Sequence, residues 1–500
     1  MASVRPAASV VLVQEDGRVL WVRRGEKLRF AGGFYAFPGG RVDVEDAAVP
    51  LAGAGGLDPS EAPCVVAAAR ELFEEAGVLA VPGADRVPAE ERVAVRKALL
   101  EHPGFSFGDF LRKHDLAVDA SWFLPAGRWV TPPAMPIRFD ARFYLVELRP
   151  GEEAEIWPGE LADGEWIAPA EALRRWEQGS ALLHPPAWHT LKSLAHARSP
   201  REALPLLTAP DKAPWKLPID EHVVKRIEFQ RGLIMVPLRT PTLPPATHTN
   251  CLLLGDEELW VVDPGSPWPE QQAILRETLD KLAEEGREAV GVVLTHHHPD
   301  HVGGAQALGL SIAATRATAE LLDFRVDRVI EDDARFEVGP RGWRALHLPG
   351  HTRGHLCLIE EGSGAVVAGD LVAGVGTVIV DPPEGDMLDY LRSLDRLLAQ
   401  KPGTIYPAHG PVVPSGVAKL EEYRAHRLQR EERVLEALEG AGGPALPAEL
   451  VPAAYPDVKP EVYPLAERSL LAHLHKLVRE GRAAEAGGRF TAARGPSRSR

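Results

Sequence analysis

Seven consecutive residues in the second half of the chain constrain its fold most strongly. The segment 295–301 reads Thr-His-His-His-Pro-Asp-His and directly follows the apolar run 291–294. Because such a run predicts a buried strand, we expect the histidines and the aspartate on a loop at the strand's carboxyl end. The four donors His296, His298, Asp300 and His301 cannot all reach one metal in tetrahedral geometry, but they can divide between two neighbouring ions. The segment therefore predicts a hydrolytic two-metal centre.

Three further motifs with metal-ligating side chains follow in order along the chain. They are Pro349-Gly350-His351-Thr352, Gly369-Asp370 and Pro407-Ala408-His409-Gly410. Together with segment 295–301 and the upstream Val262-Asp263-Pro264-Gly265, this order resembles the metallo-β-lactamase superfamily over residues 230–415. The resemblance implies an αβ/βα sandwich that holds two metal ions.

The same resemblance implies a role for each ligand. The first metal would be held by His296, His298 and His351. The second metal would be held by Asp300, His301 and His409, with Asp370 as the bridge between the two. His297 would point away from the metals, whereas Asp263 and His355 would support the ligands.

Imidazole and carboxylate ligands suit zinc, so we expect two Zn²⁺ ions, although residue type alone also allows iron or manganese. A water shared between two divalent ions loses a proton near neutral pH and becomes the nucleophile. Asp300 and Asp370 would orient this hydroxide, so the catalytic chemistry requires no serine or cysteine nucleophile.

The sequence after the bridging aspartate is similar to the metallo-β-lactamase-like protein 2 group. The similarity is carried by residues 375–379, 389–394, 405–412 and 472–477, and it includes a small winged-helix domain. It implies cleavage of single-stranded RNA, with Lys476, Arg479 and Arg482 as strand contacts. These cations are also typical of a solvated helix face. Thioester hydrolases of the glyoxalase type share the metal ligands, so the ligands alone do not choose the substrate.

A second cluster of acidic residues lies near the N-terminus. Glu71, Glu74 and Glu75 share one face of a helix predicted over 64–77. Three carboxylates so close together repel one another unless a hard cation such as magnesium neutralises them. Taken alone, the cluster would indicate a solvated helix face.

The context of this helix resembles the Nudix box, G-x5-E-x7-R-E-U-x-E-E-x-G-U. Gly39 to Glu45 fits the first half and Arg70 to Val78 the second, while residues 46–69 replace the usual seven. The resemblance covers residues 5–195 and implies an α/β/α sandwich. It implies that Glu71, Glu74 and Glu75 hold Mg²⁺ or Mn²⁺, with Glu74 and Glu75 catalytic and Glu45 as a helper. Gly39 and Gly40 would let the backbone approach closely, and Arg70 would pair with a carboxylate.

An insertion in the box is typical of Nudix hydrolases that act on coenzyme A. Arg24, Arg29, Gly33 and segments 129–132 and 138–143 loosely follow the same subgroup. The resemblance implies a small-molecule diphosphate substrate, a nucleoside diphosphate derivative such as coenzyme A, with Arg29 at the substrate site.

Five hundred residues exceed what one core usually supports, so we expect several domains. We predict an α+β protein with a Nudix domain over 1–199, a proline-containing linker over 200–229, a metallo-β-lactamase-fold domain over 230–415 and a helical, winged-helix domain over 416–500. Within the last, Arg424, Arg427, Arg430 and Arg433 recur about once per turn. This spacing predicts a solvated helix face.

Composition narrows the partners and the compartment. The net charge of −15 argues against a broad nucleic-acid surface but allows a local basic patch. Three scattered cysteines without C-x-x-C spacing indicate a reducing compartment. The sequence shows neither a signal peptide nor an apolar run of about 18 residues, so we expect a cytoplasmic protein without a membrane span. The oligomeric state is not indicated.

The favoured hypothesis is a bifunctional hydrolase, a Nudix diphosphatase fused to a two-metal hydrolase. One alternative is a glyoxalase-like thioester hydrolase whose Nudix domain only senses a ligand. Another is a regulator that binds nucleic acid through the winged helix, and a third is an oxidoreductase with a single iron. The complete set of Nudix acids argues against a ligand sensor, and the ligands for a second metal argue against a single iron. Both therefore favour two catalytic sites.

Overall fold

The computed structural model describes residues 3–493, apart from residues 27, 29, 30, 103, 134, 136, 158, 216, 339 and 340. The chain forms two compact units, Met1–Ile234 and Met235–Arg500. In the part that the structure describes, no helix has both the length and the apolar character that crossing a lipid bilayer requires.

Unit 1 is built on a mixed sheet with β1 (Val4–Val13) near its centre. β8 (Arg138–Glu147) pairs with β1 in parallel, and β2 (Val19–Arg24) and β4 (Gly39–Arg41) pair with it antiparallel. The sheet also includes β3 (Tyr35–Ala36), β7 (Leu124–Val130) and β9 (Leu161–Ile167).

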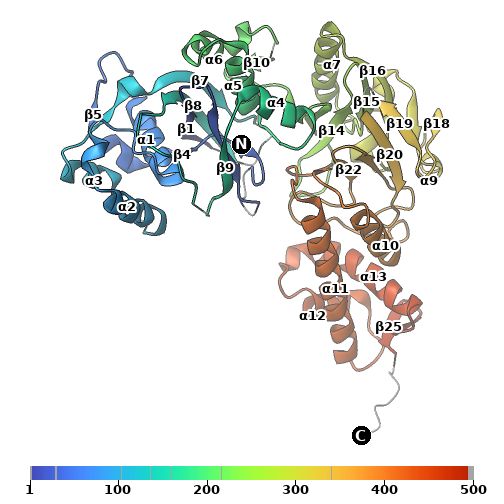
Figure 1. Cartoon of the computed structure of the whole chain (residues 1–500). Helices are drawn as coiled ribbons and strands as arrows, with labels where there is room; N and C mark the ends of the chain where they lie inside the picture. The colour runs from blue at the N-terminus through green and yellow to red at the C-terminus, as the bar shows by residue number, and fades with distance from the viewer. Residues whose placement is uncertain are drawn as a thin grey trace. The chain divides into compact units, whose positions relative to one another are not determined.

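Alternation along β1 divides the core of unit 1 into two layers. Val10 and Leu12 pack in one cluster with α1 (Ala62–Ala76), α2 (Ala89–Glu101) and α3 (Phe107–Lys113). Val11 and Val13 pack in the other with α4 (Pro169–Glu177) and α5 (Pro185–His196). Since successive side chains of a strand point to opposite faces, this pattern places helices on both faces of the sheet (Figure 1). The predicted α/β/α sandwich is confirmed.

The segment predicted as a linker, 200–229, is folded. It contains α6 (Leu204–Thr208), β10 (Ile219–Asp220), β11 (Val223–Val224) and β12 (Ile227–Gln230). β11 extends the sheet of unit 1 by pairing in parallel with β7. Prolines such as Pro205 and Pro210 stand in the first turns of short helices, where the missing N–H costs no helical hydrogen bond.

Unit 2 contains two sheets. The first includes β13 (Leu233–Arg239), β14 (His248–Leu254), β15 (Glu258–Val262), β16 (Glu288–Val293), β17 (Ile312–Ala314) and β18 (Arg328–Val329). The second has the order β19 (Arg335–Val338), β20 (Arg341–His347), β21 (Leu356–Glu360), β22 (Val366–Gly369) and β23 (Ile405–Pro407). α7 (Pro269–Glu284) contacts β16, and the residues Tyr390, Leu394 and Leu397 of α10 (Met387–Leu398) pack on the second sheet. This is the predicted metallo-β-lactamase domain (Figure 1).

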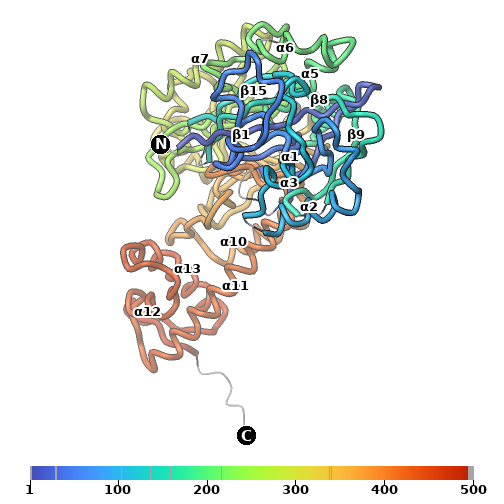
Figure 2. Tube along the Cα trace, turned by 90° about the vertical axis from the view of Figure 1, so that its left-hand side faces the viewer, coloured from blue at the N-terminus to red at the C-terminus, as the bar shows by residue number. Residues whose placement is uncertain are grey.

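The C-terminal end of unit 2 is a winged helix, as predicted. α11 (Gly416–Gly440), α12 (Pro447–Ala454) and α13 (Tyr463–Arg479) lie together, followed by the hairpin β24 (Ala483–Ala486) and β25 (Arg489–Ala492) (Figures 1 and 2). Leu450, Leu470, Leu474 and Phe490 form its core.

One prediction for α11 is wrong. Arg427 and Arg430 are only 3% and 6% exposed, so half of the expected solvated arginine face is buried. The spacing of one turn was correct, but α10, α12 and α13 pack on the same face.

Candidate metal centres

Four side chains from three loops meet at one end of the strands in unit 2. His296 and His298 precede α8 (Pro299–Val302), His351 follows β20, and Asp370 follows β22. One ligand atom from each lies within 4.8 Å of the others. His298 Nδ1 lies 2.9 Å from His296 Nε2 and 3.1 Å from His351 Nε2. Tetrahedral zinc with Zn–N bonds of about 2.0–2.1 Å needs nitrogens about 3.3 Å apart, so this spacing fits one ion.

A second set, Asp300, His301 and His409, also has ligand atoms within 4.8 Å of one another. Asp370 faces both sets with different oxygens. Its Oδ2 lies 3.5 Å from His351 Nε2, whereas its Oδ1 lies 3.6 Å from His301 Nε2 and 3.4 Å from His409 Nε2. This geometry is compatible with a carboxylate that bridges two ions.

The chemistry of these donors fits metal ions. Among the described residues, His301 Nε2 and Asp370 Oδ1 are buried without a hydrogen-bond partner. Such atoms are costly to bury unless something else satisfies them. Burial, reinforced by the neighbouring imidazoles, lowers the pKa of His298 to about 3. Burial also lowers the pKa of His296 and His351, so these rings are neutral near pH 7, as metal ligation requires.

Hydrogen bonds from the protein fix which nitrogen of each histidine faces the cluster. Asp263 Oδ2 accepts from His301 Nδ1 at 2.8 Å, and the same carboxylate accepts from both the backbone N–H and the hydroxyl of Thr295. Asp263 holds this position with a φ of 51°, a conformation that is strained for a non-glycine residue. The N–H of Asp370 donates to His355 Nε2 at 3.0 Å. Asp263 and His355 thus contact the ligands that the sequence analysis expected them to support.

The neighbouring His297 belongs to neither set. Its ring lies 4.9 Å from that of His298, centroid to centroid, and it is half-buried.

Sequence reasoning missed Asn250. Its side-chain amide donates to the carbonyls of Pro407 and Gly410 at 3.0 and 2.9 Å, and its backbone N–H donates to that of Ala408 at 2.7 Å. These bonds bracket His409 on both sides. The signal that the sequence offers is an amide residue placed directly before the apolar run 251–254.

In unit 1 the three Nudix acids project from α1, which ends at Gly77 with the left-handed φ of 72° typical of a helix C-cap. The N–H of Gly39 donates to Glu75 at 2.7 Å. A Cβ on Gly40 would lie only 2.4 Å from Glu71 Oε1, so a larger residue there would displace the Glu71 carboxylate. Glu71 and Glu74 instead contact Arg70, at 2.8 and 3.3 Å.

Unlike the histidine sets of unit 2, these three carboxylates do not all converge within 4.8 Å. Burial raises the pKa of Glu71 to about 8 and that of Glu75 to about 7. Burial also raises the pKa of Glu74. These carboxylates are therefore poorly solvated as anions, and a bound cation would stabilise their charged form.

Asp46 supplies a carboxylate of the kind that Arg70 is expected to pair with. Asp46 is 2% exposed and accepts two hydrogen bonds from Arg70, at 2.9 and 3.1 Å, whereas Glu45 is exposed. Counting the box from Gly40, and not from Gly39, places Asp46 at the sixth following position. Arg29, the other predicted substrate residue, lies outside the described residues.

The cations predicted to contact RNA are paired within the protein. Lys476 is 6% exposed and lies 2.7 Å from Glu431 and 2.8 Å from Glu480. Arg482 also reaches Glu431, at 2.7 Å, and Arg479 pairs with Asp386. Lys476 is thus held against an acid of α11, and its role as a strand contact stays a prediction.

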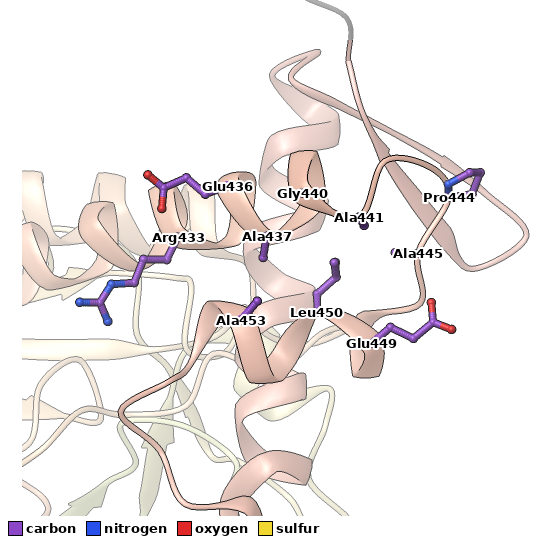
Figure 3. Close-up of a pocket in the computed structure, with 10 residues that line it drawn as sticks. All are labelled: Arg433, Glu436, Ala437, Gly440, Ala441, Pro444, Ala445, Glu449, Leu450 and Ala453. Carbon is purple, nitrogen blue, oxygen red and sulfur yellow. The ribbon is translucent and has the colours of Figure 1, made fainter.

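A pocket of about 550 Å³ lies between α11 and α12 (Figure 3). Small apolar side chains, including Ala437, Leu450 and Ala453, face one another in it. No residue of either metal-binding set lines this pocket, so it is separate from the candidate centres.

We predict that Asn250→Asp weakens metal binding by the Asp300, His301 and His409 set. A carboxylate at this position would face the carbonyls of Pro407 and Gly410 and repel them, which would release the loop that carries His409. Loss of such a supporting contact typically costs about 10–100-fold in metal affinity. Competition with a chelator measures the effect, and an unchanged affinity in a folded variant would contradict it.

We predict that Asp46→Asn destabilises unit 1 by up to about 3–5 kcal/mol, because it removes the most deeply buried of the carboxylates that pair with Arg70 and leaves that guanidinium with Glu71 and Glu74. Glu45→Gln is the matched control on the adjacent residue and should change the free energy of unfolding little. Urea unfolding of both variants measures the difference. Equal stabilities would show that the Arg70–Asp46 pair is unimportant.

Comparisons with known proteins agree with this architecture. The family described as Metallo-beta-lactamase superfamily matches residues 244–322 and 310–409. Residues 447–491 match the Beta-lactamase associated winged helix domain, and residues 3–185 match the NUDIX domain.

Three relatives are similar to part of the chain. The "Beta-lactamase-like protein 2 homolog" of Drosophila melanogaster is 29% identical over 41% of this chain and 73% of its own length. The "Lactamase-like protein ptaB" of Pestalotiopsis fici is 30% identical over 46% of this chain and 74% of its own. The "Atrochrysone carboxyl ACP thioesterase" of Aspergillus chevalieri is 34% identical over 38% of this chain and 60% of its own, so the chain spans less than two thirds of that relative.

The NUDIX and metallo-β-lactamase families are both families of hydrolases. The metal-ligating sets, the two-sheet domain around them and the 30% identity to a relative covered over 74% of its length agree on one assignment. The chain belongs to the metallo-β-lactamase superfamily, with a NUDIX domain before the metallo-β-lactamase domain and a winged helix after it.

Proposed function

We propose that the C-terminal domain is a two-zinc hydrolase that cleaves an ester or thioester, and that the Nudix domain is a diphosphatase that requires Mg²⁺ or Mn²⁺. The observation that carries the first proposal is Asp370, whose two oxygens face the two ligand sets separately. A thioester is favoured over RNA because Lys476, Arg479 and Arg482 are paired with acids. The thioesterase named among the relatives supports the same choice.

Two bound divalent ions would supply a water of lowered pKa and would stabilise negative charge on the substrate oxygen. Within the chain, the neutral rings of His296, His298 and His351 would hold one ion. Asp300, His301 and His409 would hold the other. The neighbouring His409 and His301 outweigh the effect of burial and keep the pKa of Asp370 well below its ordinary value, so this carboxylate stays ionised. Asp300 and Asp370 would accept hydrogen bonds from the attacking water and orient it.

In the Nudix domain, Glu71, Glu74 and Glu75 would hold the cation that activates water against a diphosphate. Gly39 orients Glu75 through its N–H, and Gly40 leaves room for Glu71. We propose a nucleoside diphosphate derivative such as coenzyme A as the substrate class, and a cytoplasmic location for the protein. Loss of any box acid would have favoured a ligand sensor, but all three are present.

We predict that the two activities separate by mutation. His298→Ala should lower thioester hydrolysis by more than about 100-fold, the upper limit for residues that only support a metal ligand, and should leave diphosphate hydrolysis unchanged. Glu74→Gln should do the reverse. A panel of acyl thioesters, single-stranded RNA and coenzyme A, assayed on each variant, measures both rates.

His297→Ala is the matched control for His298→Ala, because it removes the neighbouring histidine of the same loop, which belongs to neither ligand set. Metal content should fall in His298→Ala and stay constant in His297→Ala. RNA cleavage that depends on His298, without thioester cleavage, would overturn the choice of substrate. One iron per chain in the wild-type protein would overturn the two-zinc centre and favour an oxidoreductase.

A further inference from the structure

The loop 371–386, which follows Asp370, is attached to the C-terminal helices along most of its length. Tyr423 of α11 accepts a hydrogen bond from the N–H of Ala373 at 2.8 Å and donates to the carbonyl of Gly376 at 2.8 Å. Further along, Arg427 of α11 donates to the carbonyl of Val378. The position of this loop therefore depends on α11.

The loop in turn orients a proposed metal ligand. The carbonyl of Ile379 accepts from His351 Nδ1 at 2.7 Å, which directs Nε2 toward Asp370 and His298. Ile379 is the residue after Val378. The guanidinium of Arg427 thus lies one peptide away from the acceptor that fixes the ring of His351.

α13 holds the second half of the same loop. Arg468 pairs with Asp381, and Arg479 pairs with Asp386. The N–H of Asp386 donates to the carbonyl of Gly350, the residue before His351, at 2.8 Å. His351 is therefore connected to the winged helix on two sides, through Ile379 and through Gly350.

Arg427 itself is an expensive residue to bury. Its guanidinium lies 5.2 Å from the centre of the Tyr390 ring, and its Nε, among the described residues, is buried without a hydrogen-bond partner. A charge removed from water is costly unless it is well paired. The Val378 carbonyl and the Tyr390 ring offset the cost of burying the Arg427 charge only in part. A contribution to the stability of α11 therefore does not explain why a buried arginine stands at this position.

Other contacts between α11 and the C-terminal helices do not involve the loop 371–386. Glu431, one turn after Arg427, is buried between Lys476 and Arg482, with 2.7 Å to each. Arg430 donates to the carbonyl of Ala454 at 2.7 Å and pairs with Asp457 at 2.9 Å. Arg427 can therefore be changed while these ties between the helices remain.

We propose that Arg427 is a positioning residue for the first metal-binding set, and that the winged helix braces this set. Arg427 fixes the Val378–Ile379 peptide, and the carbonyl of the next peptide, that of Ile379, orients His351. Two cations on α13 serve the same purpose, Arg468 through Asp381 and Arg479 through Asp386. This inference rests on the proposed two-metal site.

The test compares Arg427→Gln, Arg427→Lys and Arg430→Gln in the full chain. Affinity for Co²⁺ is measured by chelator competition, the visible spectrum of bound Co²⁺ reports the ligand geometry, and urea unfolding reports stability. We expect Arg427→Gln to lower the affinity of one of the two ions by about 10–100-fold and to alter the spectrum. Arg427→Lys, which keeps a donor toward Val378, should restore part of both.

Arg430→Gln is the matched control, because it removes a buried arginine of the same helix. This arginine binds Ala454 and Asp457 and forms no hydrogen bond or ion pair with the loop 371–386 in the described part of the chain. It should lower stability and leave Co²⁺ affinity and the spectrum unchanged. Wild-type Co²⁺ affinity in Arg427→Gln would overturn the proposal. An equal loss of Co²⁺ affinity in Arg430→Gln would overturn it too, because it would indicate a general effect of destabilising the C-terminal helices. Wild-type protein that binds fewer than two ions would instead overturn the proposed function.

Discussion

The architecture of the C-terminal domain depends on one carboxylate placed between two groups of imidazoles. Asp370 lies at the end of β22, where one oxygen faces His351 and the other faces His301 and His409. Burying an ionised acid with several rings is costly in a chain without metal, because some of these atoms lack partners. Two bound cations would give these buried ligand atoms partners and would form a stable, reactive centre. The strands, loops and supporting residues of unit 2 can be understood as the framework that keeps these groups together.

Three of the supporting contacts use the histidine nitrogen that faces away from the cluster. Asp263 binds Nδ1 of His301, the carbonyl of Ile379 binds that of His351, and the carbonyl of His248 binds that of His409. Since a neutral imidazole has one donor and one acceptor nitrogen, each contact leaves Nε2 as the free lone pair. The acceptors come from three different parts of the fold, so the ring orientations require a complete domain. In the Nudix unit the arrangement is simpler, because one helix carries all three acids and the backbone at Gly39 and Gly40 lies close to two of them.

The sequence was informative where chemistry is concentrated in short segments. The motifs at 295–301, at His351, at Asp370 and at His409 predicted the fold, and the structure brings these residues together. Prediction failed where the deciding contact joins distant segments. Asp46 was overlooked because the insertion separates it from Arg70 by 24 positions. Asn250 contacts residues about 160 positions away. The burial of Arg427 depends on packing between α11 and helices that come before and after it in the sequence. Residue spacing within α11 could not distinguish a solvated face from a packed one.

The central claim is that Asp370 bridges two metal ions, and diffraction at the zinc absorption edge tests it most directly. Crystals of the zinc-loaded protein should give two anomalous peaks about 3.5–4 Å apart, as in other two-metal hydrolytic sites. One peak should lie beside His296, His298 and His351, the other beside Asp300, His301 and His409, with one Asp370 oxygen on each. A single peak, or two peaks with Asp370 bound to only one of them, would contradict the two-metal centre.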